Sequence, residues 1–282
     1  MNPAVDSAAA LGPVRLTEEE YRDIAHLARH SFGLELGEGK QQMVAGRLAK
    51  NMRELNIRSV REYQQYVKSD TTGEALVSLI DVLTTNHTNF FREPTHFDFL
   101  RDRILPERPG PLRVWCAASS TGEEPYSIAM TLREHGKPSE GHSILATDIS
   151  TRVLAVAERG MYRADRFPAE GPEPWIRKFL QRGDGRGEGW YRMRPEVRGM
   201  IEFKRLNLIE PLPKIGPFAV IFCRNVMIYF GRETQELVVN QLTTRLEPGG
   251  FLLVGHSESL TGVKHGLEQI KPAVYRKPGR RS

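Results

Sequence analysis

The sequence predicts an α/β protein: a Rossmann-like domain with a small antiparallel β-subdomain inserted in it, preceded by an all-helical N-terminal domain. Three observations lead to this prediction. From residue 112 onward, apolar runs of strand length alternate with segments of helical period, which is typical of parallel βαβ units. Residues 16–86 show helical periods only. The chain closes with two short strands, LEQIK and AVYRK, separated by Pro272, which indicates a final antiparallel hairpin.

Composition restricts the class of protein. With 282 residues, 39% of them hydrophobic and 27% charged, the chain can build one large domain and a smaller one. It has no apolar run near the roughly 20 residues of a membrane span and no signal peptide, so we expect a cytoplasmic protein. Cys116 and Cys223 lie in predicted buried strands, the histidines are scattered and no HExxH motif is present, so no metal site is expected. The net charge of +5 indicates an acidic partner.

The first part of the chain predicts a helical domain over residues 16–86. Residues 1–15 are rich in Ala, Pro and Gly and are expected to be disordered. A capping box at residues 17–20 opens a helix to about His30, and residues 40–55, 59–68 and 73–85 show further helical periods. Arg47, Lys50 and Arg53 fall at three-residue steps on one helix face. That face is either a solvated surface or a docking surface for acidic helices.

Residues 87–111 are expected to form a linker and a connecting helix. In the segment TTNHTNFFREPTHFDFL (residues 84–100), polar side chains are interleaved with Phe90 and Phe91, just before a helix begun by Pro94. A free linker has no core in which to bury two adjacent phenylalanines. We therefore expect this segment to fold back against the large domain.

The stretch LRVWCAASSTGEEPYSIA (residues 112–129) predicts a nucleoside-binding loop. A short buried strand, a run of small residues with Gly122 and a helix beginning near Pro125 form the first half of a βαβ unit. The loop has one glycine where the dinucleotide fingerprint has three, and Glu123 and Glu124 would repel a pyrophosphate. The pattern favours a nucleoside without phosphates, and S-adenosylmethionine (SAM) is the candidate. An ordinary strand–turn–helix with solvated acids is the alternative.

The residues SILATDIS (143–150) predict a second strand that ends in Asp148, followed by a helix begun by Ser150 or Thr151. A carboxylate in this place can accept hydrogen bonds from both ribose hydroxyls, although it could instead cap the next helix. Polar residues lie at the ends of four predicted strands or their loops, and the carboxyl ends of parallel strands face one crevice. These residues, which could line one cleft, are Glu123, Asp148, Asn207 and Asn225.

Residues 163–205 interrupt the alternation, and the inserted β-subdomain is placed at about residues 180–205. WYRMR and MIEFK alternate like exposed antiparallel strands, which predicts a small hairpin. Its edge could accept a peptide strand or be decoration. PFAVIFCRNVMIYF (217–230) then predicts a third buried strand with Arg224, Asn225 and Tyr229 at its end, before a helix over 233–246 and the strand FLLVG.

Five motifs, TNFFRE, STGEEPYSIA, ATDIS, RNVMIYF and GHSESL, occur in an order and spacing that resembles the CheR-type chemotaxis receptor methyltransferases, from about residue 15 to residue 276. The resemblance implies a SAM-dependent methyltransferase domain over 112–282, which esterifies glutamate side chains on the cytoplasmic helices of bacterial chemoreceptors during signalling adaptation. It also implies a three-stranded β-subdomain, which in this family can dock a C-terminal pentapeptide found on some receptors.

The resemblance further implies a cofactor site. Its residues map to Asn86, Thr88 and Arg92 in the first motif, to Glu123 and Asp148, to Asn207 and Leu208 near the adenine, and to Arg224 and Asn225. Because a glutamate is already ionised at neutral pH (ordinary pKa about 4.3), methyl transfer to it requires alignment and a dry pocket rather than a general base. We expect Arg92 to steer the incoming carboxylate or line the methyl site. We expect Tyr229 to orient the substrate through a hydrogen bond, although it could be a core aromatic residue.

Three other functions share parts of the pattern. A nucleic-acid methyltransferase would use the same cofactor, but it commonly carries a polar–Pro–aromatic motif where this chain has RNVMIY. A non-catalytic sensor or adaptor would bind SAM or a receptor peptide, and the presence of Arg92, Glu123, Asp148 and Tyr229 argues against it. A dehydrogenase would need the missing glycines.

Overall fold

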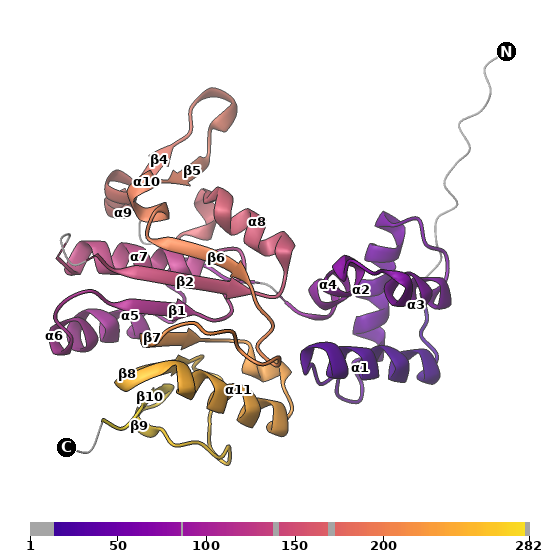
Figure 1. Cartoon of the computed structure of the whole chain (residues 1–282). Helices are drawn as coiled ribbons and strands as arrows, with labels where there is room; N and C mark the ends of the chain where they lie inside the picture. The colour runs from indigo at the N-terminus through magenta and orange to yellow at the C-terminus, as the bar shows by residue number, and fades with distance from the viewer. Residues whose placement is uncertain (1–13, 86, 138–140, 169–172, 280–282) are drawn as a thin grey trace. The chain divides into compact units, whose positions relative to one another are not determined.

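The computed structural model describes residues 14–85, 87–137, 141–168 and 173–279 (Figure 1). The chain forms two compact units, one up to Thr85 and one from Asn86 onward. Asn86 and nearly all of the segment expected to be disordered lie outside the described residues. In the described part of the chain, no helix is both long and apolar enough to cross a bilayer.

The first unit is helical. Its helices are α1 (Glu18–Phe32), α2 (Gln41–Glu54), α3 (Val60–Ser69) and α4 (Glu74–Leu83). The capping box at the start of α1 is confirmed: Glu20 N donates to Thr17 Oγ1 over 3.2 Å, and Thr17 N donates to the Glu20 carboxylate over 2.8 Å. Apolar residues at helical spacing meet inside the unit, as the periods predicted. Its fully buried residues include Ile24, Ala28, Val44, Leu48, Tyr63 and Leu79.

The second unit is built on a seven-stranded sheet with the order β6-β2-β1-β7-β8-β10-β9. Its strands are β1 (Arg113–Cys116), β2 (Ser143–Asp148), β6 (Ile201–Arg205), β7 (Phe218–Cys223), β8 (Leu246–Val254), β9 (Glu268–Lys271) and β10 (Val274–Arg276). The pairs among β6, β2, β1, β7 and β8 are parallel, and β10 runs antiparallel to both β8 and β9. This arrangement confirms the predicted Rossmann-like class and the closing antiparallel hairpin.

The central strands of this sheet are buried on both faces. Successive side chains of a strand point to opposite faces, so each of these strands contributes to two apolar clusters. Val114 and Cys116 of β1 belong to the apolar cluster on one face, and Trp115 belongs to the cluster on the other. The first face is covered by α5 (Thr95–Phe99), the π-helical turn η1 (Leu100–Ile104) and α7 (Glu123–His135), and the second by α11 (Arg232–Arg245). The short α6 (Leu105–Glu107) continues η1, and α8 (Thr151–Arg159) follows β2.

The predicted hairpin of WYRMR with MIEFK is wrong. A separate three-stranded antiparallel sheet has the order β3-β5-β4, with β3 (Met161–Arg163), β4 (Leu180–Arg182) and β5 (Trp190–Met193). The residues of MIEFK instead form most of β6, which pairs in parallel with β2 at the margin of the large sheet. An alternating pattern fits an exposed antiparallel strand and a half-covered edge strand equally well, so the pattern could not separate the two. The elements η3 (Ala164–Arg166), α9 (Glu173–Phe179), η4 (Gly185–Gly187) and α10 (Pro195–Arg198) complete this region.

The strand expected over residues 217–230 is shorter than predicted. β7 ends at Cys223, and Asn225 adopts a left-handed backbone with φ 56°. A 3₁₀ turn, η5 (Met227–Tyr229), follows. The chain therefore turns sharply at the carboxyl end of β7, and Arg224 and Asn225 lie in the turn rather than in the strand.

Gly122 gives a test of the turn from β1 into α7. Its backbone is left-handed with φ 99°, and a Cβ atom there would come 2.6 Å from Tyr162 Oη and 2.8 Å from Ala157 Cβ. We expect Gly122→Ala to lower the free energy of unfolding by about 1–3 kcal/mol, measured by denaturant titration of the full chain. Gly266→Ala is the matched control, since a Cβ there meets nothing within 4 Å. Equal unfolding midpoints for the two variants would contradict the described close approach.

Candidate active site

Four neighbouring parallel strands bring the predicted polar residues to one edge of the sheet (Figure 1). Asp148 is the last residue of β2, Asn207 comes shortly after β6, and Asn225 comes shortly after β7. Because β6, β2, β1 and β7 are parallel and adjacent, their carboxyl ends lie side by side. The loop from β1 into α7 runs along the same edge.

Asp148 holds the loop after β1 in place. Its carboxylate accepts hydrogen bonds from Ser120 N at 2.8 Å and from Ser150 N at 3.0 Å. The N-cap of α8 is Ser150, whose hydroxyl accepts from Val153 N, so Asp148 is not itself the capping residue. The half-buried Asp148 side chain therefore lies between the small-residue loop and the start of α8.

A buried arginine joins three segments beside this edge. Only 1% of the Arg224 side chain is exposed, and its guanidinium pairs with Glu124 at 2.6 Å and with Glu93 at 2.9 Å. It also donates to the backbone carbonyl of Arg92. Burial raises the pKa of Glu93, but the opposing effect of the Arg224 charge and of hydrogen bonds leaves this pKa below its ordinary value. Arg224 thus links the residues before α5, the start of α7 and the end of β7.

Glu258 organises the turn that contains Asn225. Its buried carboxylate accepts hydrogen bonds from Gly255 N at 2.6 Å, Asn225 N at 2.8 Å and Ile228 N at 3.3 Å. Burial raises the pKa of Glu258, while these backbone donors oppose the rise. The left-handed turn after β7 and the loop after β8 are therefore held by one carboxylate.

Glu123 is buried, whereas Arg92 of the motif TNFFRE is exposed. The Glu123 side chain is fully buried, where it pairs with Arg166 at 2.6 Å and accepts from Thr121 Oγ1 at 2.6 Å. Arg92 is exposed, and its guanidinium donates to His87 O at 3.0 Å. The expected folding of this segment against the large domain is confirmed from Phe90 onward, because Phe90 stacks on Phe167 at 4.2 Å and Phe91 N donates to Ser127 Oγ.

The remaining predicted residues lie around the same strands. Asn207 forms a local turn, with its amide donating to Glu210 at 3.0 Å and its oxygen accepting from Ile209 N. Leu208 is buried in the apolar cluster under α11, and Tyr229 is half-buried in η5. Thr88 is buried, and Asn86 lies outside the described residues.

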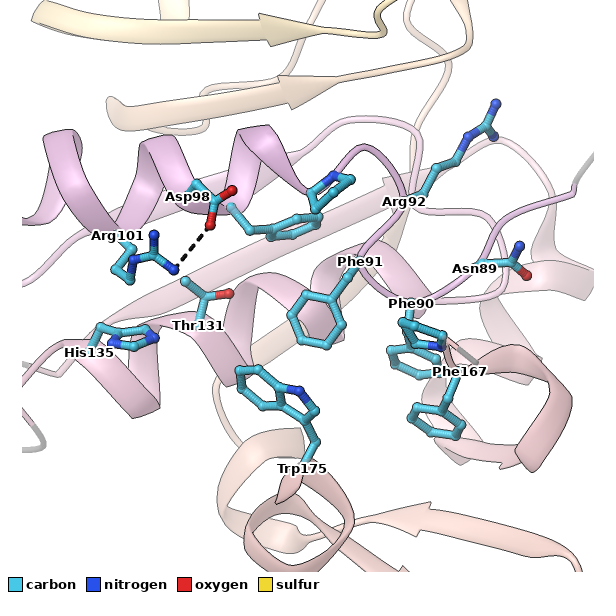
Figure 2. A pocket seen from close by; sticks show the side chains of 13 residues that line it. Asn89, Phe90, Phe91, Arg92, Asp98, Arg101, Thr131, His135, Phe167 and Trp175 are labelled. Carbon is cyan, nitrogen blue, oxygen red and sulfur yellow. Dashed lines mark ion pairs between the residues drawn. The ribbon is translucent and has the colours of Figure 1, made fainter. Parts of the chain in front are cut away.

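A cavity of about 910 Å³ lies beside the second half of α7 (Figure 2). Thr131 and His135, from the second half of α7, line it together with Phe91 and Trp175, whose rings are 4.8 Å apart. Arg92 is at its margin, with its side chain directed away from the aromatic rings. The cavity brings together none of the other predicted cofactor residues, so the edge of the sheet remains the candidate site.

In the first unit, the three basic residues of α2 do not share one environment. Arg47 is half-buried, and it donates to the last carbonyls of α4 at Leu83 (3.0 Å) and Thr84 (3.3 Å) and to Thr85 Oγ1 at 2.9 Å. It stabilises the end of α4. Lys50 and Arg53 are exposed.

Sequence reasoning did not assign a role to four residues that build the site. Glu93 and Glu258 are acids inside the motifs TNFFRE and GHSESL, so their place in these motifs was the available signal. His96 and Arg166 had no local signal, because their partners His256 and Glu123 are far away in the sequence.

The strand order, the reversed β10, the small-residue loop after β1 and the acid at the end of β2 define an α/β domain of the nucleoside-binding methyltransferase class. The family models "CheR methyltransferase, SAM binding domain" and "CheR methyltransferase, all-alpha domain" match residues 86–276 and 19–84. The chain belongs to the CheR methyltransferase family. It is a SAM-dependent methyltransferase of chemotaxis, with SAM as its methyl donor.

Three relatives illustrate the similarity, and each is a chemotaxis protein methyltransferase. The protein of Klebsiella aerogenes is 40% identical over 92% of this chain and 90% of its own length. That of Escherichia coli K12 is 39% identical over 92% and 91%, respectively. That of Borreliella burgdorferi is 37% identical over 94% and 96%.

Glu258 gives a test of the turn after β7. In Glu258→Gln, the new amide group would face backbone N–H donors, so at least one buried donor would lose its acceptor. We expect this variant to lower the free energy of unfolding by about 1–3 kcal/mol and to weaken SAM binding, measured by denaturant titration and calorimetry. The exposed Glu268→Gln is the control. Unchanged stability and SAM affinity in Glu258→Gln would show that the carboxylate does not organise the turn.

Proposed function

We propose that the protein transfers the methyl group of SAM to glutamate side chains on the cytoplasmic domains of bacterial chemoreceptors, and that it works in the cytoplasm. The observation that carries this proposal is the convergence of Asp148, Asn207 and Asn225 at the carboxyl edge of four adjacent parallel strands, in a chain of the CheR family. The receptor substrate follows from the family.

The residues at this edge suit a nucleoside. Small side chains at positions 117–120 keep the backbone of the loop accessible to a ligand. Within the described residues, Ser119 Oγ is buried without a hydrogen-bond partner, so the loop holds a polar group that a ligand or water could satisfy. Asp148, half-buried at the end of β2, is the proposed acceptor for the ribose hydroxyls.

Other contacts to the cofactor remain proposals. Asn225 is the best supported of them, because Glu258 and Glu93 hold its backbone and its side chain. Asn207 and Leu208 suit the adenine end, since they follow the neighbouring strand β6. Arg224 acts through its buried ion pairs rather than at the surface. The remaining proposed contacts are Asn86, Thr88, Arg92 and Glu123, of which Glu123 would first have to exchange its Arg166 partner.

The reaction requires alignment more than proton transfer. SAM supplies an electrophilic methyl group, and a glutamate carboxylate (ordinary pKa about 4.3) attacks it without losing a proton. The chain therefore has to orient the carboxylate and exclude water. Arg92 is exposed while its backbone is anchored by Arg224, so it is the proposed group that meets the incoming carboxylate. Tyr229, in the turn after Asn225, is the proposed second orienting group.

Two surfaces are proposed for the receptor. On α2, the exposed Lys50 and Arg53 lie on one face and suit acidic receptor helices, whereas Arg47 is occupied at the end of α4. The second surface is the small sheet, in which β5 is central and β3 and β4 are the outer strands. An outer strand there can add an extended peptide, which supports docking of a receptor C-terminal pentapeptide.

Labelled SAM tests the proposed reaction. After incubation of the protein with methyl-labelled SAM and receptor cytoplasmic domains, we expect label in the receptor that alkali releases, because carboxyl esters are alkali-labile. Arg92→Ala is expected to lower the turnover rate, and Asp148→Asn to weaken SAM binding in calorimetry because it removes the charge at the proposed ribose site. Alkali-stable label, or label in added RNA instead of receptor, would exclude glutamate esterification. Wild-type kinetics and SAM affinity in both variants would remove the proposed roles.

Charge reversal tests the α2 surface. We expect the double variant Lys50→Glu, Arg53→Glu to slow receptor methylation about tenfold at low salt through weaker association, with unchanged SAM affinity. The difference should shrink at high ionic strength. Reversal of the exposed Lys214 and Lys264 in the second unit alters net charge equally and serves as the control. If the control variant slows methylation as much, net charge and not this surface determines the rate.

A further inference from the structure

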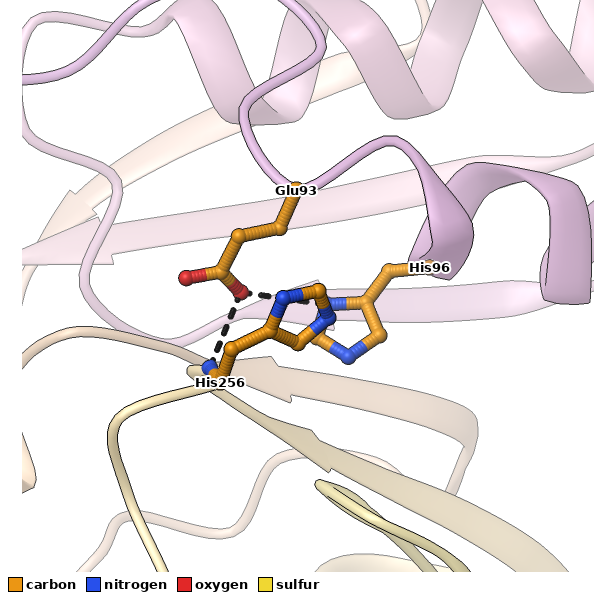
Figure 3. A group of neighbouring side chains, drawn as sticks. All are labelled: Glu93, His96 and His256. Carbon is orange, nitrogen blue, oxygen red and sulfur yellow. Dashed lines mark hydrogen bonds and ion pairs between the residues drawn. The ribbon is translucent and has the colours of Figure 1, made fainter.

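Three potential metal ligands lie together beside the buried Arg224 (Figure 3). Glu93 and His96 are one helical turn apart at the start of α5, and His256 follows β8. One ligand atom from each side chain lies within 4.8 Å of the other two. The fold therefore joins a carboxylate and two imidazoles from opposite ends of the second unit's sequence.

His96 is the unexplained member of this group. Its residue is 1% exposed, and in the described structure neither Nδ1 nor Nε2 makes a hydrogen bond. The nearest acid, Glu93, is 3.5 Å from Nδ1, which is long for a hydrogen bond. The ring of His256 lies 4.7 Å from that of His96, edge to face. Buried imidazole nitrogens are ordinarily bonded, so two unsatisfied ones in one ring indicate a missing ligand or water.

We propose that Glu93, His96 and His256 bind a divalent transition-metal ion, with Zn²⁺ as the probe. Two imidazoles and one carboxylate form a ligand set that Zn²⁺ uses, and imidazole selects such ions over Mg²⁺ and Ca²⁺. Bonds of about 2.0–2.2 Å require the three ligand atoms to approach one another more closely than they do here. The exposed His256 can supply this movement, since its only described side-chain bond is to the exposed Thr95 hydroxyl, at 3.1 Å.

The metal would compete with existing partners of Glu93. One oxygen of this carboxylate accepts from Asn225 Nδ2 at 3.2 Å, and the other from Arg224 at 2.9 Å and from His256 N at 3.1 Å. A cation bound to Glu93 weakens the attraction of this carboxylate for Arg224 and for the amide of Asn225. These partners therefore reduce the affinity of the site for the metal, and metal binding weakens SAM binding where Asn225 contributes to it. This last consequence rests on the proposed function, whereas metal binding itself does not.

A second histidine pair must be removed before the measurement. His26 and His30 are exposed one turn apart on α1, with ring centroids 6.3 Å apart, and such a surface pair can chelate Zn²⁺ unaided. The parent protein is therefore the untagged full chain carrying His30→Ala. Zn²⁺ is titrated in competition with a chromophoric chelator, in the absence of SAM and receptor.

We expect one Zn²⁺ per chain in this parent, with excess Mg²⁺ unable to displace it. Adding His256→Ala should weaken binding by about tenfold or more, whereas the exposed His135→Ala, added in its place, should leave it unchanged. Zn²⁺ should also raise the dissociation constant of SAM in the parent and not in the His256→Ala variant. Absence of stoichiometric binding, or binding that survives His256→Ala, would overturn the proposed site. Either result would leave the methyltransferase assay above unaffected.

Discussion

The ion pairs of Arg224 are the interaction on which the site depends. A guanidinium that is 1% exposed is stable only with partners, and here two carboxylates and a backbone carbonyl supply them. These partners come from the residues before α5 and from the start of α7, while Arg224 itself lies in the turn directly after β7. Loss of one partner would leave a buried charge without compensation, so the three segments are obliged to keep their relative positions. The backbone of the exposed Arg92 is held by this buried cluster, because its carbonyl accepts a hydrogen bond from Arg224.

The carboxylate of Glu258 holds the backbone of the turn that contains Asn225. Non-glycine residues seldom adopt a left-handed backbone, and Asn is among those that tolerate it best. Backbone amides on both sides of the turn converge on Glu258, which offsets the cost of this conformation. These hydrogen bonds form without a ligand, and preorganisation of this kind favours a reaction that needs alignment.

Local patterns in the sequence predicted most of the fold. The capping box at Thr17, the strand ending in Asp148 and the closing hairpin each depend on neighbours in the chain, and each was predicted correctly. The errors and omissions concern partners distant in sequence. The residues of MIEFK pair with β2 rather than with WYRMR. The buried Arg224 pairs with Glu93, which is 131 positions away. Arg47 looked like a surface charge because nothing nearby showed that it reaches the end of α4. Which predicted polar residues touch SAM depends on the ligand itself, so neither pattern nor fold decides it.

The outer strands of the two sheets differ in a way that bears on aggregation and partner choice. At the margins of the large sheet, β6 carries the ion pair Glu202–Lys204 and β9 carries Glu268 and Lys271. Mixed charges at a margin discourage the addition of foreign strands. The small sheet instead ends in Arg163 on β3 and Arg182 on β4, with no acid in either strand. The margins of the large sheet therefore disfavour the addition of a further strand. The basic outer strands of the small sheet instead favour the addition of an acidic one.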